Sequence, residues 1–141
     1  MKTYKNKFFD KIGYKHSCCD ALIFNMKNDK RNNIWKKQRK KYGGWDERAT
    51  WNLNTFMTEQ IYTWLKMYYK YANKQINLDF YKFTIDGKEF TERECILRII
   101  ADIEFWLKNN DSLNQEKEKE ADAKISNAYK MIGIIFPVLW W

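Results

Sequence analysis

Hydrophobic residues recur at steps of three and four positions along the middle of the chain. The series consists of Leu53, Phe56, Met57, Ile61, Trp64, Leu65, Tyr68 and Ala72. Such steps place side chains on one stripe of a helix with about 3.6 residues per turn. Trp51, Tyr62 and Tyr69 form a second stripe that widens the apolar surface. The pattern therefore predicts a long aromatic helix that packs between other elements at the centre of the domain.

Small and acidic residues mark the start of this helix. Gly43 and Gly44 interrupt the segment before it, and Asp46 is placed to cap the free N–H groups of the first turn. Glu47 adds negative charge where the helix dipole favours it. We expect a helix that begins near Asp46, ends near Ala72 and is about 40 Å long.

Asp86-Gly87 lies between two short runs in which apolar and polar residues alternate. This pattern is typical of a tight turn between antiparallel strands, so Lys82–Ile85 and Lys88–Phe90 are predicted to form a β-hairpin. Thr91 follows directly, with a glutamate three residues later, which is the spacing of a capping box. A helix is therefore predicted from Thr91 to about Leu107.

The helix after Thr91 is predicted to bury one face and expose the other. Its apolar positions are Ile96, Ile99, Ile100, Ile103, Trp106 and Leu107. The polar positions expected in solvent are Glu92, Arg93, Asp102 and Glu104. A last helix opens with alternating charges at 116–120. Ser112 with Gln115 suggests a second capping box at its start, and Pro137 is expected to end it.

The composition indicates the same class of fold. A chain of 141 residues suits one domain, and 18% aromatic residues with one Pro and five Gly favour helices over a turn-rich β-sandwich. We predict a mostly α, compact helical domain with a long central aromatic helix and one short β-hairpin. Within this single domain, residues 1–42 form a basic N-terminal segment and residues 43–141 form the helical core.

The positive charge is concentrated at the N-terminal end. Residues 1–42 hold 13 Lys or Arg and three Asp, whereas the remaining residues hold 13 basic and 15 acidic side chains. Such asymmetry indicates an anionic partner, which is a nucleic acid, a nucleotide or an acidic protein surface. The alternative is that a lysine-rich arm keeps an aromatic-rich protein in solution.

A short basic helix is predicted between Asp29 and Tyr42, with Ile34 and Trp35 as its apolar anchors. The candidate phosphate-binding residues are Lys36, Lys37, Arg39, Lys40 and Arg48. The candidate residues for stacking on bases are Trp35, Trp45 and Trp51, and those for polar base edges are Asn52, Asn54 and Asn77. The alternative is that these tryptophans are buried in the corner between two helices.

The residues with metal-binding or catalytic chemistry do not form a recognised motif. His16, Cys18 and Cys19 lack the second ligand pair of a usual zinc site, and as a Cys–His pair they lack an orienting partner. The acids available for catalysis are Asp46, Glu47, Asp79 and Glu94, and each is also explained as a helix cap or a solvated charge. We predict no catalytic residue, no metal and no cofactor.

The cysteine count and the lengths of the apolar runs bear on the compartment. Three cysteines, an odd number, indicate a reduced intracellular setting. The N-terminal residues lack the apolar core of a signal peptide, and no run reaches the roughly 18–20 apolar residues that span a bilayer. We expect a cytoplasmic protein that does not bind membranes. Because one chain has difficulty burying seven Trp, nine Tyr and nine Phe, we also expect a homo-oligomer.

Four separated motifs occur in order along the chain, namely GWDERATWNLN at 44–54, INLDF at 76–80, GKEFTERE at 87–94 and the terminal PVLWW at 137–141. They resemble the motifs of a group of small phage and prophage proteins common in Gram-positive hosts. The resemblance covers roughly residues 40–141 and leaves the segment with His16, Cys18 and Cys19 outside it. It implies a phage-encoded protein made in a bacterial cytoplasm, and it assigns no activity to individual residues.

Together these observations favour a non-enzymatic binding protein that counters a bacterial defence. We expect it to sequester an anionic nucleotide messenger through the basic and aromatic candidates. The alternatives are direct binding of a host defence protein or of nucleic acid, and, less favoured, an enzyme that acts on nucleotides. A sponge returns its ligand intact, an enzyme changes the mass of its ligand, and a plain nucleic-acid binder loses affinity steeply with salt.

Overall fold

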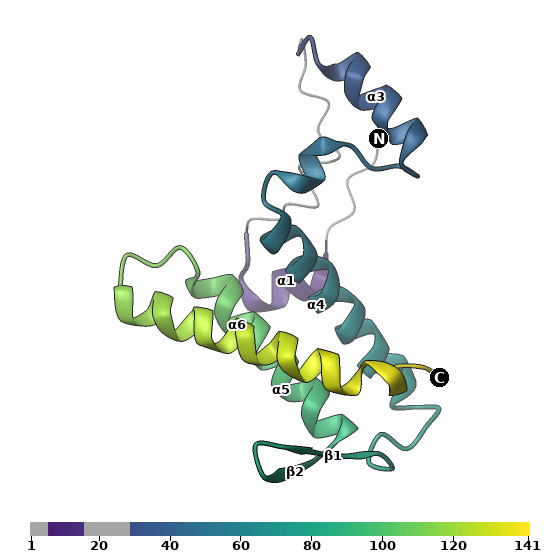
Figure 1. Ribbon diagram of the computed structural model, residues 1–141, viewed down its shortest axis with the longest axis vertical. Coiled ribbons are helices and arrows are strands. Elements are labelled where there is room, and N and C mark those ends of the chain that lie inside the picture. The colour runs from purple at the N-terminus through teal and green to yellow at the C-terminus, as the bar shows by residue number, and fades with distance from the viewer. Residues whose placement is uncertain (1–5, 16–28) are drawn as a thin grey trace. The chain divides into compact units, whose positions relative to one another are not determined.

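The computed structural model describes residues 6–15 and 29–141, and Figure 1 labels the helices and strands that they form. Its elements are α1 (Lys7–Ile12), α3 (Asn32–Lys41), the 3-10 helix η1 (Glu47–Thr50), α4 (Leu53–Ala72), β1 (Lys82–Ile85), β2 (Lys88–Thr91), α5 (Glu92–Asn109), α6 (Gln115–Ile135) and the 3-10 helix η2 (Phe136–Val138). The predicted mostly α fold with one short β-hairpin is confirmed. His16, Cys18 and Cys19 lie outside the described residues.

The chain forms two compact units, Met1–Ile61 and Tyr62–Trp141. The division falls inside α4, so the first part of this helix belongs to the N-terminal unit and the rest to the C-terminal unit. The change of charge after residue 42 is a separate feature of the composition and does not coincide with this division.

The start of the long helix differs from the prediction. Asp46 does act as a cap, because its side chain accepts the Arg48 N–H, but the element that it caps is the four-residue helix η1. The long helix α4 begins only at Leu53 and has 20 residues, which corresponds to about 30 Å. The prediction placed Asp46 at the start of α4 because a capping residue signals a helix start and does not distinguish a 3-10 helix from an α-helix.

The buried face of α4 also differs from the predicted stripe. Leu53, Met57 and Trp64 are 48%, 45% and 60% exposed, whereas Tyr62, Leu65 and Ala72 are buried. The Tyr62 hydroxyl donates to the Glu104 carboxylate at 2.7 Å. A tyrosine with such a partner buries its ring without leaving its hydroxyl unpaired, so the second predicted stripe supplies part of the core.

The C-terminal unit is built on the packing of α5 against α6, which lie across one another in Figure 1. The buried side chains of α5 include Cys95 and all six predicted apolar positions, namely Ile96, Ile99, Ile100, Ile103, Trp106 and Leu107. Those of α6 are Ala121, Ala128, Met131 and Ile135. The buried alanines of α6 take up little space, which suits the close packing that a dense core requires.

The hairpin and the first capping box are confirmed. Lys82 pairs with Thr91 and Ile85 with Lys88, and both turn residues, Asp86 and Gly87, have positive φ angles of 50° and 77°. These are the values of the tight turn that matches strand twist. The Thr91 side chain accepts the Glu94 N–H, and the Glu94 carboxylate accepts the Thr91 N–H.

The second predicted capping box is wrong. Asn114 caps α6, because its side-chain oxygen accepts the N–H groups of Glu116 and Lys117. Ser112 instead accepts the Asn114 N–H and so orders the turn before the helix. Asparagine caps as well as serine, so two candidates two positions apart, Ser112 and Asn114, left the sequence pattern ambiguous.

Two of the four polar positions expected in solvent on α5 are buried. Glu92 is 1% exposed and Asp102 is 8% exposed. Asp102 accepts a hydrogen bond from Asn127 at 3.0 Å and lies 3.7 Å from the Lys124 ammonium, both on α6. Partners from another element make this burial tolerable, and the sequence of α5 alone does not contain them.

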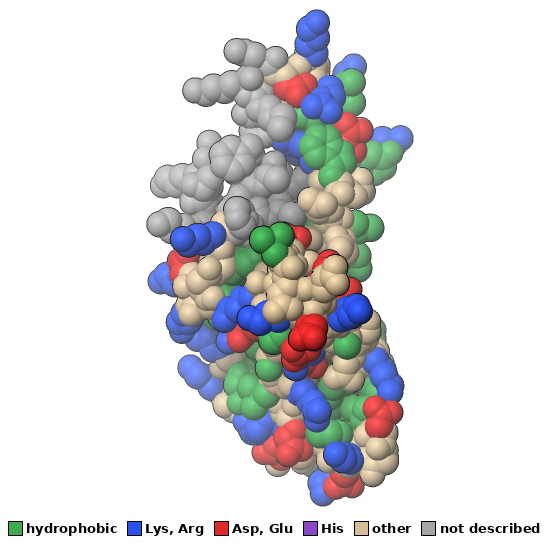
Figure 2. All heavy atoms as spheres, turned by 90° about the vertical axis from the view of Figure 1, so that its left-hand side faces the viewer, with side chains coloured by type: hydrophobic (Ala, Val, Ile, Leu, Met, Phe, Trp, Pro, Cys, Tyr) green, Lys and Arg blue, Asp and Glu red, His purple; other side chains and the backbone are tan. Residues whose placement is uncertain are grey.

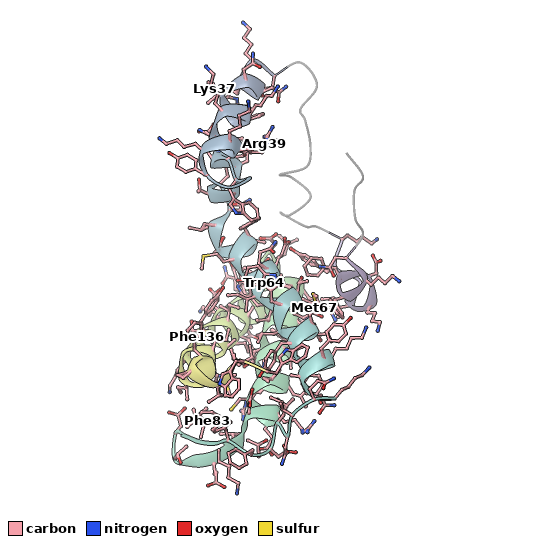
Figure 3. The ribbon with its side chains drawn as sticks, turned by 90° about the vertical axis from the view of Figure 1, so that its right-hand side faces the viewer. Lys37, Arg39, Trp64, Met67, Phe83 and Phe136 are labelled. Atoms are coloured by element: carbon pink, nitrogen blue, oxygen red, sulfur yellow. The ribbon has the colours of Figure 1, made fainter. Side chains whose placement is uncertain are left out.

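Exposed apolar side chains on α4 bear on the expected homo-oligomer, which stays a prediction. Trp64 and Met67 are 60% and 44% exposed, and their spacing of three residues puts them on one face of the helix (Figure 3).

We expect light scattering to give the mass of an oligomer. The double variant W64E/M67E should weaken self-association by at least about tenfold, since tryptophans dominate the energy of many interfaces. The matched control L113E/F136E changes two exposed apolar residues outside α4 and should leave the mass unchanged. A monomeric wild type would contradict the prediction.

Candidate anion-binding surface

The predicted basic helix is present as α3, Asn32–Lys41, and local contacts determine both of its ends. Before it, the Asp29 carboxylate accepts the Arg31 N–H at 2.8 Å and forms two further bonds with the Arg31 guanidinium. After it, Gly43 and Gly44 have positive φ angles of 62° and 99° and turn the chain. Its last turn is entirely basic, which suits the negative end of the helix dipole.

Trp35 is the core of this part of the chain. It is 0% exposed, its indole N–H donates to the Glu47 carboxylate at 2.9 Å, and the Arg48 guanidinium lies 4.3 Å from its ring centroid. The alternative of burial in a corner therefore holds for Trp35, which has no surface left for stacking on a base. Ile34, the second predicted anchor, is 52% exposed, so that expectation is wrong.

Asp46 lies at the centre of a charge cluster with two of the predicted phosphate ligands. Its side chain is fully buried, with the Arg48 guanidinium at 2.9 and 2.8 Å and the Arg39 guanidinium at 2.5 Å. Hydrogen bonds from Arg48 first, and then from Arg39, lower the pKa of Asp46 to about 2. Arg48 is 8% exposed, so it stabilises the corner and does not face solvent. Arg39 is half-buried in the same cluster.

The lysines of α3 remain available to a partner. Lys36, Lys37 and Lys40 are exposed, and they form no ion pair with any carboxylate among the described residues. Lys37 and Arg39 are two positions apart and so lie on nearly opposite sides of α3 (Figure 3). Figure 2 shows Lys and Arg side chains in blue, among the exposed atoms of one face. We call Lys36, Lys37, Lys40 and Lys41 the lysine surface.

Two of the three predicted stacking residues are exposed. Trp45 is 47% exposed and meets Phe56 edge-on at 5.3 Å, and Trp51 is 52% exposed and meets Trp35 edge-on at 6.1 Å. The Arg31 guanidinium also lies over the Trp51 ring, 5.6 Å from its centroid, so Trp51 offers a base only the part of its ring that Arg31 does not cover. Asn52 and Asn54 are exposed at the start of α4.

The structure divides the predicted site between the two units. Asn77 belongs to the C-terminal unit, whereas every other predicted site residue belongs to the N-terminal unit. Asn77 lines a pocket of about 310 Å³ together with Ile76, Phe80, Tyr81, Glu92, Val138 and Trp140. Sequence reasoning missed this pocket, because it interpreted Glu92 as a solvated charge. The sequence did contain a signal for this pocket, because the neighbouring aromatic residues Phe80 and Tyr81 precede Glu92, at the start of α5, by about ten positions.

The low pKa of Asp46 predicts a pH dependence of stability. Its carboxyl is harder to protonate in the folded chain than in the unfolded chain, so its contribution is complete above about pH 4 and is lost as the pH falls toward 2. We expect the difference in unfolding free energy between the wild type and D46N to shrink by about 2 kcal/mol between pH 5 and pH 2. Urea unfolding at several pH values measures this difference. A constant difference would show that Arg39 and Arg48 do not stabilise the charge.

The fold and its basic face place this chain among small helical proteins with an exposed lysine surface. No protein-family model, curated protein or solved structure matches the chain. Residues 6–15 and 29–141 contain no group of three or more His, Cys, Asp or Glu side chains arranged to hold a metal ion. Within the same residues, none of the helices combines the length and apolar character that a membrane span requires.

Proposed function

We propose that this chain is a non-enzymatic binding protein and that its lysine surface contacts the phosphates of a nucleotide or a nucleic acid. The observation that carries the proposal is the state of the basic residues around α3. Asp46 engages both Arg39 and Arg48, whereas Lys36, Lys37 and Lys40 are exposed and form no ion pair within the described residues. Exposed ammonium groups on one short helix suit phosphate contacts that need no fixed geometry.

The aromatic residues near α3 support a ligand that contains bases as well as phosphates. Trp45 and Trp51 follow the basic helix and keep part of their surface in solvent. Stacking on such rings contributes about 1–3 kcal/mol per base and tolerates any sequence. Trp35 and Arg48 are buried and stabilise this part of the chain. We therefore do not propose that they contact the ligand.

Nucleic acid and nucleotide are two forms of this proposal. The lysine surface lies on an exposed helix, and the residues that line the pocket near Asn77 do not include it. An open helix face favours a ligand with several phosphates spaced along a strand. A nucleotide messenger held by the same lysines is the small-molecule form.

The motifs at 44–54, 76–80, 87–94 and 137–141 supply the biological context of the proposal. Their resemblance to phage proteins suggests action in the cytoplasm of an infected bacterium against a host defence. Binding without chemical change fits either the capture of a messenger or the shielding of nucleic acid. Direct occlusion of an acidic host defence protein is the remaining form.

The experiment that tests the proposal compares ligands at two salt concentrations. Fluorescence anisotropy with a labelled single-stranded oligonucleotide should show binding that weakens steeply with salt, because phosphate contacts release counterions. Competition with di- and trinucleotides distinguishes the small-molecule form, and mass analysis of recovered ligand distinguishes binding from catalysis. If neither class binds at low salt, the proposal is wrong.

A further inference from the structure

The pocket in the C-terminal unit has a predominantly aromatic rim and one buried acid. Phe80, Trp140 and Tyr81 are 73%, 66% and 40% exposed at its edge, and Glu92 is 1% exposed in its lining. A volume of about 310 Å³ is within the range of small-molecule sites. All of these residues belong to Tyr62–Trp141.

The Tyr68 hydroxyl lies beside this pocket and faces three hydrogen-bond acceptors. The Tyr68 hydroxyl lies 2.9 Å from the Glu92 carboxylate, 3.3 Å from the Trp140 carbonyl oxygen and 3.5 Å from the Val138 carbonyl oxygen. One hydroxyl hydrogen serves one strong bond at a time, and the charged carboxylate at the shortest distance is the preferred acceptor. Among the described residues, Tyr68 is the one side chain that donates to Glu92, so the second carboxylate oxygen and the Trp140 carbonyl lack a side-chain donor.

Hydrogen bonds hold the walls of the pocket in place before any ligand arrives. The Glu92 N–H donates to the Tyr81 carbonyl at 3.1 Å, and the Arg93 N–H donates to the Leu78 carbonyl at 3.0 Å. These bonds fix the turn that carries Phe80 to the start of α5. A site with fixed walls loses less entropy when it binds a ligand.

The charge of the lining selects the kind of ligand. Among the described residues that line the pocket, Glu92 carries the one charged side chain, and none is Lys or Arg. Phosphates and carboxylates are therefore disfavoured there. A positive group with several N–H donors can bond the acceptors that Tyr68 does not serve, and aromatic rings attract a cation through their π faces.

We propose that this pocket binds a small organic cation, a protonated amine whose ammonium group meets Glu92 and whose apolar body lies against Phe80, Tyr81 and Trp140. Burial raises the pKa of Glu92 from its ordinary value, and a bound cation favours the ionised form. The proposal concerns the C-terminal unit alone and does not rest on the lysine surface of α3.

The test uses three probes of nearly the same shape. Phenethylammonium is the cation, phenethyl alcohol is the neutral analogue and phenylacetate is the anion, each titrated by calorimetry at neutral pH. We expect saturable binding of the cation that is at least about tenfold tighter than that of the alcohol, and no binding of the anion. Equal affinity for cation and alcohol, or no saturable binding of the cation, would overturn the proposal.

Two pairs of variants locate the binding. F80A should weaken cation binding about threefold or more, whereas F136A removes an aromatic ring of similar exposure outside the pocket and should have no effect. E92Q keeps the shape of the side chain and should remove the preference for cation over alcohol, with the exposed E118Q as its control. Because Phe80 is largely exposed, F80A tests the site even if E92Q does not fold. Equal affinities for F80A and F136A would exclude this pocket.

Discussion

The variant D46N is expected to destabilise the N-terminal unit by about 3 kcal/mol. Asparagine has the size of aspartate, and its one oxygen still caps η1, but its amide NH2 replaces an oxygen that accepts N–H groups of Arg39 and Arg48. The change therefore removes the charge and sets N–H donors against one another. Arg48, which is 8% exposed and bonded to Asp46 through two nitrogens, then remains buried without its counter-ion. Leaving one member of a buried ion pair is far more harmful than losing an ion pair in solvent.

The Trp35 indole N–H provides the measurement for this variant. It donates to the Glu47 carboxylate within the same corner, so its NMR signal reports the folded state of the N-terminal unit in a urea titration. The control D122N changes an exposed aspartate on α6 and should alter the midpoint little. Equal midpoints for D46N and D122N would mean that the cluster does not stabilise the corner.

Reversing three charges of the lysine surface is expected to have the largest effect on binding. The variant K36E/K37E/K40E replaces three exposed ammonium groups with carboxylates and should lower affinity for a single-stranded oligonucleotide by at least about a hundredfold at low salt. The slope of log affinity against log salt should also become shallower, since fewer counterions are released. Fluorescence anisotropy at several salt concentrations gives both quantities.

The control for this variant has the same net charge. K108E/K117E/K119E reverses three exposed lysines in the C-terminal unit and should retain most of the affinity. Equal losses in the two variants would show that net charge, and not the lysine surface, governs binding. In that case the basic N-terminal segment, residues 1–42, keeps the protein in solution, which was the alternative that the charge distribution left open.

Local chemistry made much of the fold predictable. The hairpin depends on Asp86 and Gly87, which adopt the positive φ angles of a tight turn, and the start of α5 depends on Thr91 and Glu94, three residues apart. Each feature is complete within a few residues. The apolar stripe of α5 was predictable for the same reason, because the spacing of its apolar residues can be read within one continuous segment.

Features that depend on distant partners were not predictable. The buried face of α4 includes Tyr62 because its hydroxyl bonds to Glu104, 42 positions away. Glu92 is buried because it accepts a hydrogen bond from Tyr68, 24 positions away. In the candidate site, the positions of Lys36, Lys37 and Lys40 follow from helix periodicity. The sequence did not predict that Arg48 is buried and so cannot contact a phosphate. Asp46 was interpreted as a helix cap alone, and its bonds to the Arg48 guanidinium were not expected.

Because Cys95 is buried, the rate at which its thiol is labelled reports how often the C-terminal unit opens. Its thiol is 0% exposed, and burial raises its pKa, so a reagent that needs an accessible thiolate reacts only when the packing of α5 and α6 opens. The labelling rate of Cys95, with Cys18 and Cys19 replaced by serine, thus equals the reactivity of a free thiol multiplied by the fraction of molecules that are open. Any ligand that binds only the closed core slows this labelling in proportion to its occupancy, and a mass spectrum records that rate without a spectroscopic probe.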